Sequence, residues 1–185
     1  YDKTVFKPVK GDALVNSLRG YGLEVGKYFL FVGTVQPRKN LERLVKAFSI
    51  YVKDDRRWMV EDGTLKMDGR GWNKKDPSSN FYLQKSTFNP QSSTVKFVLA
   101  GSKGWLSDQI YELPKQLGIE DRVKFLGYAP DEDLPALYSG AIALTFPSLF
   151  EGFGLPILEA QACGCPVVTA NISSMPEVGG AIYVN

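Results

Sequence analysis

The stretch AIALTFPSLFEGFGLPILEAQACGCPVVTA, residues 141–170, contains the pattern that decides the fold. It begins with an apolar run at 141–147, passes through a glycine loop into a helical pattern at 155–164, and ends in a second apolar run at 166–170. Two short apolar runs on either side of a helix are typical of parallel strands joined by a crossover helix. The stretch therefore predicts a strand–helix–strand unit of an α/β sheet.

The same alternation of apolar runs and helical patterns occurs along most of the chain. Runs without a polar face predict strands buried on both sides, and the helical patterns between them would cover the two faces. We therefore expect an α/β fold with a doubly wound, parallel, Rossmann-like sheet. The expected strands are 27–33, 94–101, 122–127, 141–147, 166–170 and 181–185, and the expected helices are 40–52, 106–118, 130–141 and 155–164.

Two segments interrupt this alternation. Residues 1–27 are interpreted as a linker or as the end of a preceding N-terminal domain, which places the nucleotide-sugar-binding domain discussed below at 28–185. Residues 54–93 have no sustained period and are rich in glycine, asparagine, serine and charge, which predicts a surface insertion. Its aromatic side chains would pack on the domain or form a lip or hairpin. Both chain ends look cut, which favours a domain excised from a longer protein.

The composition excludes several classes of function. The 185 residues are 44% hydrophobic and 23% charged with a formal net charge of +2, which disfavours nucleic acid or an anionic membrane as the main partner. The sequence has no histidine, so histidine-based catalysis and histidine-ligated metals are excluded, and we expect no metal site. Cys163 and Cys165 are one residue apart, which suits buried free thiols and a reducing compartment.

The loop EGFGLP, residues 151–156, has the strongest chemical signal. Gly154 and Leu155 offer free backbone N–H groups at the start of a helix, which is a binding site for phosphate. Glu151 and Glu159 lie eight positions apart around this loop, and ionised carboxylates accept hydrogen bonds from groups such as sugar hydroxyls. The alternative is structural: Glu159 would offset the helix dipole and Glu151 would be an ordinary loop charge.

Two cations follow the first expected strand. Arg38 and Lys39 lie in a loop at the carboxyl edge of the expected sheet, where doubly wound sheets bind their ligands. Arginine offers phosphate oxygens a planar fork and lysine offers a compact charge. With the helix start at Gly154, these cations predict a ligand that contains phosphate. The absence of G-x-G-x-x-G after this strand, and of a Walker motif, argues against a dinucleotide cofactor and against a P-loop hydrolase.

Four blocks of sequence resemble, in order, the C-terminal donor-binding domain of retaining GT-B glycosyltransferases of the glycosyltransferase 4 type. The blocks are FVGTVQPRKNLERLVKAF, LAGSKGW, VKFLGYAPDEDLPALYSGA and FPSLFEGFGLPILEAQACGCPVVTAN. Their most specific feature is the spacing Glu151-x7-Glu159 around GFGLP. The resemblance is strongest to the mannosyltransferase-like members that act on lipopolysaccharide and O-antigen, and it implies the C-terminal half of a GT-B fold.

The resemblance implies catalytic roles for three residues. Glu151 would contact the transferred hexose, and Lys39 and Arg38 would stabilise the negative charge that develops on the leaving diphosphate. Many members of the family have an arginine directly after the glycine of the first loop, but this chain has Thr34 there. That departure makes Arg38 the expected second cation.

The resemblance also implies a set of donor-binding residues. Glu159 would hold the nucleotide ribose, the backbone at Gly154 and Leu155 would hold the diphosphate, and residues 127–129 match the place where the base lies. The expected set is Glu159, Gly154, Leu155, Phe153, Gly33, Thr34, Gly101, Tyr128 and Ala129.

The expected function is that of the donor half of a hexosyltransferase, without a cofactor or metal and with retention of configuration. The donor would be a nucleotide-diphosphate sugar, GDP-mannose by resemblance or else a UDP-sugar. The acceptor, a glycan or lipid-linked sugar, would be held by an N-terminal domain outside this chain, so the chain alone is expected to be inactive. We expect a cytoplasmic protein, free or peripheral to a membrane at full length. The alternatives are a non-catalytic nucleotide-sugar-binding or interaction module, and an epimerase or phosphorylase of the same fold.

Two smaller features are expected to be structural. Trp105 is expected to pack on the domain. Ser173 and Ser174 precede Met175 and Pro176 and are expected to cap a short helix, although the same turn lies near the donor in similar enzymes.

Overall fold

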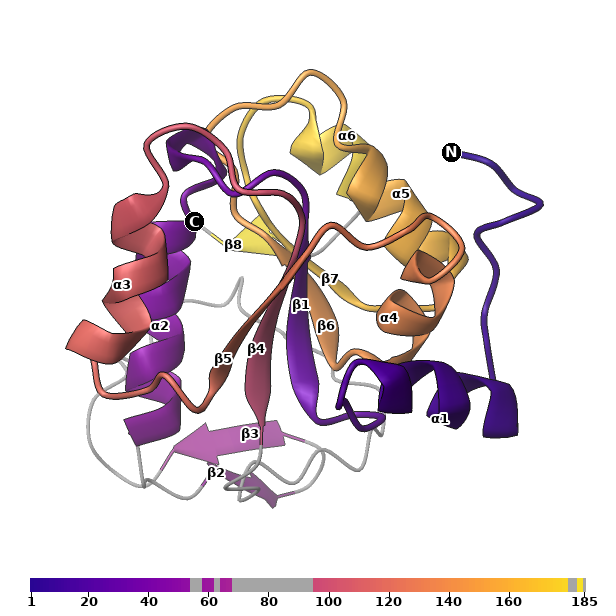
Figure 1. Ribbon diagram of the computed structural model, residues 1–185, viewed down its shortest axis with the longest axis horizontal. Helices are drawn as coiled ribbons and strands as arrows, with labels where there is room; N and C mark the ends of the chain where they lie inside the picture. Colours follow the sequence, from indigo (N-terminus) through magenta and orange to yellow (C-terminus); the bar gives the residue numbers. More distant parts are fainter. Residues whose placement is uncertain (54–57, 62–63, 68–94, 180–182, 185) are drawn as a thin grey trace.

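The computed structural model describes residues 1–53, 58–61, 64–67, 95–179 and 183–184. Its central sheet has the strand order β5-β4-β1-β6-β7-β8, and every neighbouring pair is parallel (Figure 1). The strands of this sheet are β1 (Tyr28–Val32), β4 (Lys96–Ala100), β5 (Val123–Gly127), β6 (Ala143–Phe146), β7 (Val167–Ala170) and β8 (Tyr183–Val184). The expected doubly wound parallel α/β sheet is confirmed.

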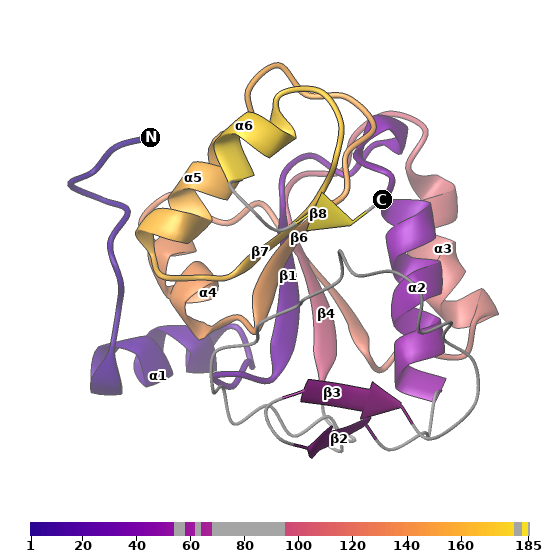
Figure 2. The same ribbon diagram turned by 180° about the vertical axis from the view of Figure 1, so that it is seen from behind.

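Helices cover both faces of the sheet (Figures 1 and 2). Helices α2 and α3 lie together on one face, whereas α1, α4 and α5 lie on the other. The helices are α1 (Gly11–Gly20), the 3-10 turn η1 (Pro37–Lys39), α2 (Leu41–Lys53), α3 (Asp108–Gln116), α4 (Leu134–Gly140), α5 (Leu155–Ala162) and α6 (Met175–Gly179). Helix α3 begins two residues later than expected, after Leu106 with φ +50°, and α4 begins after Asp133 rather than at residue 130.

The core of the fold is formed where the central strands are covered on both sides. Phe31 on β1 and Phe146 on β6 are fully buried, and their rings stack with centroids 6.1 Å apart. Burial of one such side chain contributes about 1.5–3 kcal/mol to stability. This pair joins two strands whose carboxyl ends form the centre of the site described below.

The strand order creates a switch point between β1 and β6. The chain moves outward from β1 to β4 and β5, and then returns across the sheet through α4 so that β6 pairs with β1. The loops after β1 and β6 therefore leave the sheet side by side, at the upper edge in Figure 1. In open α/β sheets, ligands bind in the crevice at such a point.

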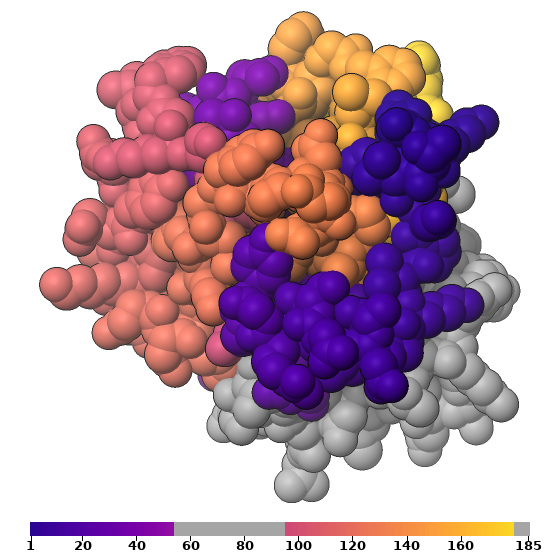
Figure 3. Space-filling model, turned by 45° about the vertical axis from the view of Figure 1, so that its right-hand side comes forward, coloured from indigo at the N-terminus to yellow at the C-terminus, as the bar shows by residue number. Residues whose placement is uncertain are grey.

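The N-terminal residues pack as part of the domain. Within 1–27, which the sequence interpretation set apart as a linker, Phe6, Leu14 and Leu18 are buried in the core. Helix α1 lies against α4, and Figure 3 shows the N-terminal residues covering that part of the surface. A Cβ added to Gly140 on α4 would approach the Leu18 Cδ1 to 2.5 Å, so the two helices are in close contact.

The expected insertion contains a strand pair. Strands β2 (Trp58–Glu61) and β3 (Thr64–Met67) pair in antiparallel fashion, with Trp58 opposite Met67. The rest of 54–93 lies outside the described residues, as does much of the expected last strand, of which β8 pairs with β7. None of the helices in the described ranges has both the length and the apolar character needed to cross a bilayer.

Candidate functional site

The loops after β1, β4 and β6 are hydrogen-bonded to one another at the switch point. Val35, after β1, forms a parallel bridge with Lys103, after β4. On the other side, the backbone N–H of Leu149, after β6, donates to the carbonyl oxygen of Arg38 at 2.9 Å. Three loops that are far apart in sequence are therefore held as one layer above the carboxyl ends of the strands.

Two glycines allow β1 and β4 to approach each other beneath this layer. Gly33 has φ +140° and Gly101 has φ +154°, a region that favours glycine. A Cβ on Gly101 would lie 2.0 Å from the Gly33 carbonyl oxygen, and one on Gly33 would lie 3.8 Å from the Lys39 Nζ. The structure thus brings two expected site residues together and places Gly33 beside the Lys39 side chain. Thr34, the next residue, is exposed.

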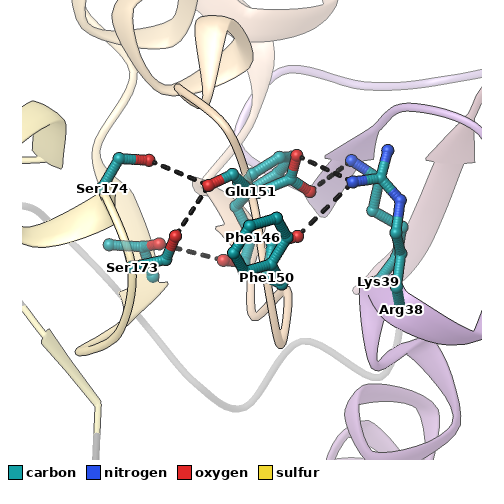
Figure 4. A network of polar contacts seen from close by, with 8 residues as sticks. Arg38, Lys39, Phe146, Phe150, Glu151, Ser173 and Ser174 are labelled. Carbon is teal, nitrogen blue, oxygen red and sulfur yellow. Dashed lines mark hydrogen bonds and ion pairs between the residues drawn. The ribbon is translucent and has the colours of Figure 1, made fainter.

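A buried ion pair lies at the centre of the site (Figure 4). Lys39, the last residue of η1, donates from Nζ to Oε1 of Glu151 in the loop after β6, and both residues are less than 9% exposed. The Lys39 Nζ also lies 5.0 Å from the centroid of the Phe146 ring. A buried charge is tolerated only when it is paired, so each of the two ionic groups requires the other.

Arg38 adds a second positive charge at the mouth of the site. Its Nη1 lies 3.6 Å from Oε2 of Glu151 and 3.5 Å from the carbonyl oxygen of Phe150. Its side chain is 47% exposed, so the guanidinium group is accessible to a ligand. The structure therefore brings together all three residues that were expected to be catalytic.

The backbone of Glu151 is held from a further loop, which lies between β7 and α6. Ser173 donates from Oγ to the Glu151 carbonyl oxygen at 2.7 Å, and Ser174 donates to the same oxygen at 3.4 Å (Figure 4). These hydroxyls were expected to cap α6, and the structure gives them the Glu151 carbonyl oxygen as a partner. The two serines therefore link the loop after β7 to the backbone of Glu151.

The start of α5 has the geometry of an anion site. Gly154 precedes the helix with φ +89° and ψ +45°, Pro156 is in the first turn, and no described side chain caps the first N–H groups. Uncapped N–H groups at a helix start bind anions. Phe153 and Leu155 are 55% and 47% exposed, so this end of the loop has an apolar surface.

Glu159 has a different partner from Glu151. It lies on α5, where the Tyr138 hydroxyl on α4 donates to its Oε2 at 2.8 Å. Burial raises the pKa of Glu159 above its ordinary value of 4.5, the Tyr138 hydrogen bond works in the opposite direction, and the charge of Asp131 adds to the increase. The two acids therefore sit in separate environments, one held by cations and the other by a hydroxyl.

The remaining expected residues follow β4 and β5, the strands that lie beyond β1 in the sheet. Tyr128, after β5, is 72% exposed, and the neighbouring Ala129 is buried. The N–H of Gly101 donates to the Gly127 carbonyl oxygen at 2.7 Å, so the ends of β4 and β5 are joined. Trp105 is 62% exposed, which contradicts the expectation that it packs on the domain.

The cysteines and acids of the described ranges form no metal centre. Cys163 and Cys165 are both buried as free thiols, and burial raises the pKa of Cys163 to about 11 and that of Cys165 to about 12. Thiols with such pKa values are largely protonated at neutral pH and are poor nucleophiles. No group of three or more His, Cys, Asp or Glu residues suited to a metal ion occurs among the residues that were searched.

Two residues that hold the site were missed in the sequence. Tyr138 falls in an apolar helical pattern and Phe146 in an apolar strand, so both read as core residues. Each is indeed buried, but Tyr138 bonds Glu159 and Phe146 lies beneath the Lys39 ammonium. Local periodicity indicates burial and does not indicate which polar group a buried aromatic residue meets.

Solved structures with the same architecture define the class of fold. The C-terminal domain of the glycosyl transferase group 1 protein LpcC from Francisella tularensis has a TM-score of 0.67 at 19% identity, covering 100% of this chain and 80% of that one. Anabaena Alr3699/HepE in complex with UDP has a TM-score of 0.67 at 19% identity, covering 100% of this chain and 42% of that one. The chain has the Rossmann-like fold of a C-terminal GT-B glycosyltransferase domain.

The sequence comparison then identifies the family. The family described as "Glycosyl transferases group 1" matches residues 80–181, more than half of the chain. The chain belongs to this family, and the resemblance to the glycosyltransferase 4 type is confirmed.

Two curated relatives show how the chain relates to longer proteins. O-antigen chain mannosyltransferase B of Escherichia coli is 36% identical over 163 residues, which cover 88% of this chain and 33% of the relative. D-inositol 3-phosphate glycosyltransferase of Salinispora tropica is 34% identical over 190 residues, which cover 98% of this chain and 33% of the relative. The chain spans about a third of the length of these relatives.

Proposed function

We propose that this chain is the donor-binding domain of a hexosyltransferase that uses a nucleotide-diphosphate sugar. The observation that supports this most is the cluster of Lys39, Arg38 and Glu151 at the switch point. Two cations and an uncapped helix start suit a diphosphate, and a carboxylate beside them suits the hydroxyls of a sugar. The acceptor would be a glycan or lipid-linked sugar bound by a further domain, in line with the name of the O-antigen relative.

The proposed chemistry is electrostatic and needs no metal. When the bond between the sugar and the diphosphate breaks, negative charge develops on the leaving group. Lys39 is already held in place by Glu151 and by the Phe146 ring, so its charge requires little reorganisation during the reaction. We expect Arg38, which is half exposed, to close onto the diphosphate when the donor binds. Retention of configuration is part of the proposal because the family resemblance implies it.

Glu151 has a dual role in this proposal. Its two carboxylate oxygens have about four acceptor positions, and Lys39 and Arg38 occupy only part of that capacity. The remaining positions suit hexose hydroxyls. The pairing with two cations also compensates the charge of Glu151, so that this carboxylate repels a nearby diphosphate less than a free one would.

The donor is proposed to be GDP-mannose, with a UDP-sugar as the alternative. The name of the Escherichia coli relative supports mannose, and the structure of Anabaena HepE in complex with UDP supports a nucleoside diphosphate at this fold. The exposed Tyr128 would lie beside the base.

Calorimetric titration of this chain with GDP, UDP, ADP and GDP-mannose tests the proposal. We expect one base to bind in preference to the others, and we expect Lys39→Met to weaken that binding. Lys46→Met is a matched control, because Lys46 is exposed on α2 and pairs with Glu42. Failure of every nucleotide to bind both this chain and the full-length protein at millimolar concentration would contradict the proposal. Donor binding by the full-length protein without turnover would favour a non-catalytic binding module.

The affinity for the nucleotide sugar should depend on pH through Glu159. Its pKa is raised by burial, and the ionised form is the one that offers both oxygens to the ribose hydroxyls. The affinity is therefore at its full value well above the pKa of Glu159 and falls as the pH drops through that pKa. Because this pKa is raised, the fall occurs at a higher pH than it would for an exposed glutamate. Titrations with a nucleotide sugar between about pH 4 and about pH 8 measure the effect, because this range begins near the ordinary pKa of a glutamate and extends well above it.

Glu159→Gln is the control for this pH dependence. The variant has no ionisable group at this position, so its weaker binding should stay level over the same range. Because burial disfavours the ionised form in the folded state, we also expect the variant to be at least as stable as the parent at neutral pH. If the affinity of both proteins fell equally at acid pH, the pH dependence would belong to another titrating group.

A further inference from the structure

We propose that Ser173 is a positioning residue that acts on the donor site through Glu151; this inference rests on the function proposed above. The Ser173 hydroxyl donates to the Glu151 carbonyl oxygen at 2.7 Å across 22 positions of sequence. Ser174 approaches the same oxygen at 3.4 Å, so the contact of Ser173 is the closer of the two.

The backbone of Ser173 indicates that its hydroxyl is important at this position. Its φ is +56°, in the left-handed region that serine adopts at a cost and glycine adopts freely. Glycine would remove the strain but would also remove the hydroxyl. Residues held in this region gather at ligand-binding sites when surrounding contacts maintain them. Here the maintaining contact is the hydrogen bond to Glu151.

Glu151 is held at both ends. Lys39 and Arg38 contact its carboxylate, and Ser173 contacts its carbonyl group (Figure 4). The neighbours of Glu151 give it little further support, since Phe150 is 66% exposed and a Cβ at Gly152 would meet nothing within 4 Å. The position of the buried carboxylate therefore depends on a few directed contacts from outside its own loop.

Loss of the Ser173 hydroxyl would move the ion pair as a unit. Glu151 would gain freedom at its backbone, and Lys39 would follow, because its ammonium group is bonded to that carboxylate. Small displacements of groups that hold a reacting substrate reduce rates severely. Ser173 is expected to affect the donor without touching it, whereas Glu151 and Lys39 are expected to touch it.

Ser173→Gly removes the hydroxyl and relieves the left-handed strain, so this variant should fold. Ser173→Ala is the second variant, and Ser17→Ala is the remote control, since Ser17 bonds the Ala13 carbonyl oxygen within α1. The first readout needs no donor: the ¹⁵N-detected ammonium signal of Lys39 in the free chain. We expect that signal to shift or broaden in both Ser173 variants and to stay unchanged in Ser17→Ala.

The second readout is the affinity for the nucleotide sugar identified by the titrations above. We expect Ser173→Gly to weaken binding about five- to tenfold, as a loss of one positioning hydrogen bond would. The same change made in a Glu151→Ala background should have no further effect, because residues that act through one another are not additive. A general loss of folding would weaken binding in both backgrounds.

The two readouts separate this inference from the proposed function. An unchanged Lys39 signal in the Ser173 variants would overturn the positioning role, as would an equal loss of affinity in the Glu151→Ala background. If the parent chain and the full-length protein bind no nucleotide, the proposed function fails, and the Lys39 signal still decides whether Ser173 positions the ion pair.

Discussion

Lys39→Met is expected to reduce hexosyl transfer by the full-length enzyme by about 10²–10³-fold, the typical effect of removing one fixed electrostatic donor from an active site. Lys39 is the buried cation of the site, and both Glu151 and the Phe146 ring hold it in place. Methionine has a similar length and no charge, so the variant removes the interaction with the diphosphate and leaves the side-chain volume nearly unchanged. Initial rates with saturating donor and acceptor measure the effect.

The same substitution should also lower stability. It leaves the buried Glu151 carboxylate with Arg38 at 3.6 Å as its cationic partner. Breaking a buried pair by removing one partner costs on the order of 3 kcal/mol. Adding Glu151→Gln to Lys39→Met should recover much of this stability without restoring transfer. That outcome would separate the catalytic effect from the folding effect, and the exposed Lys46→Met is the control for both.

Transfer within about threefold of the parent by a folded Lys39→Met enzyme would contradict the assigned role, because such a change corresponds to less than about 0.7 kcal/mol in the barrier. A rate loss that the Lys39→Met and Lys46→Met variants shared equally would point to a general effect of surface charge instead.

Gly101→Ala is expected to destabilise the domain by about 3 kcal/mol or more. Two effects add to this cost: the new side chain is packed too closely against the backbone, and alanine has an unfavourable φ at this position. The added Cβ would lie 2.0 Å from the Gly33 carbonyl oxygen and 2.5 Å from its carbonyl carbon. Both atoms belong to the backbone at the end of β1, so no side-chain rotation relieves the clash. The φ of +154° adds strain for any residue with a Cβ.

Chemical denaturation followed by circular dichroism tests this prediction. Gly20→Ala is the matched control, because Gly20 ends α1 and an added Cβ there would meet nothing within 4 Å. Alanine favours the helical state over glycine by about 0.5–1 kcal/mol, so the control should be neutral or stabilising. Equal midpoints for the Gly101 and Gly20 variants would show that β1 and β4 separate easily at this edge. Because Gly33 adjoins Lys39, we also expect a partly folded Gly101→Ala protein to bind the donor poorly.

The layers of the fold could be predicted because their signals are local. Apolar runs such as 27–33 and 94–101 end in glycine and alternate with helical patterns, which indicates a parallel α/β sheet. The N-terminal segment was harder to interpret, because α1 is short and its buried Leu14 and Leu18 acquire their meaning only from the contact with α4.

The candidate site could be predicted as a set of residue types but not as a set of contacts. The loop with Glu151 and the cations Arg38 and Lys39 were recognised, and the structure brings them together. Ser173 was read as a helix cap because serine before a short helix usually has that role. Its actual partner lies 22 residues earlier on another strand's loop, and no local pattern records such a contact.

The sequence by itself determined the alternation of elements, the glycines that end the strands and the chemical character of the loops, because periodicity and residue chemistry are contained in short stretches. Only the tertiary structure decided which loops meet. The return crossover places β6 beside β1, and this brings Lys39 to Glu151 across 112 positions. Since the charge of a buried group is stabilised by whatever surrounds it in space, the pairing of Glu151 with cations and of Glu159 with the Tyr138 hydroxyl follows from the packing of the sheet and its helices.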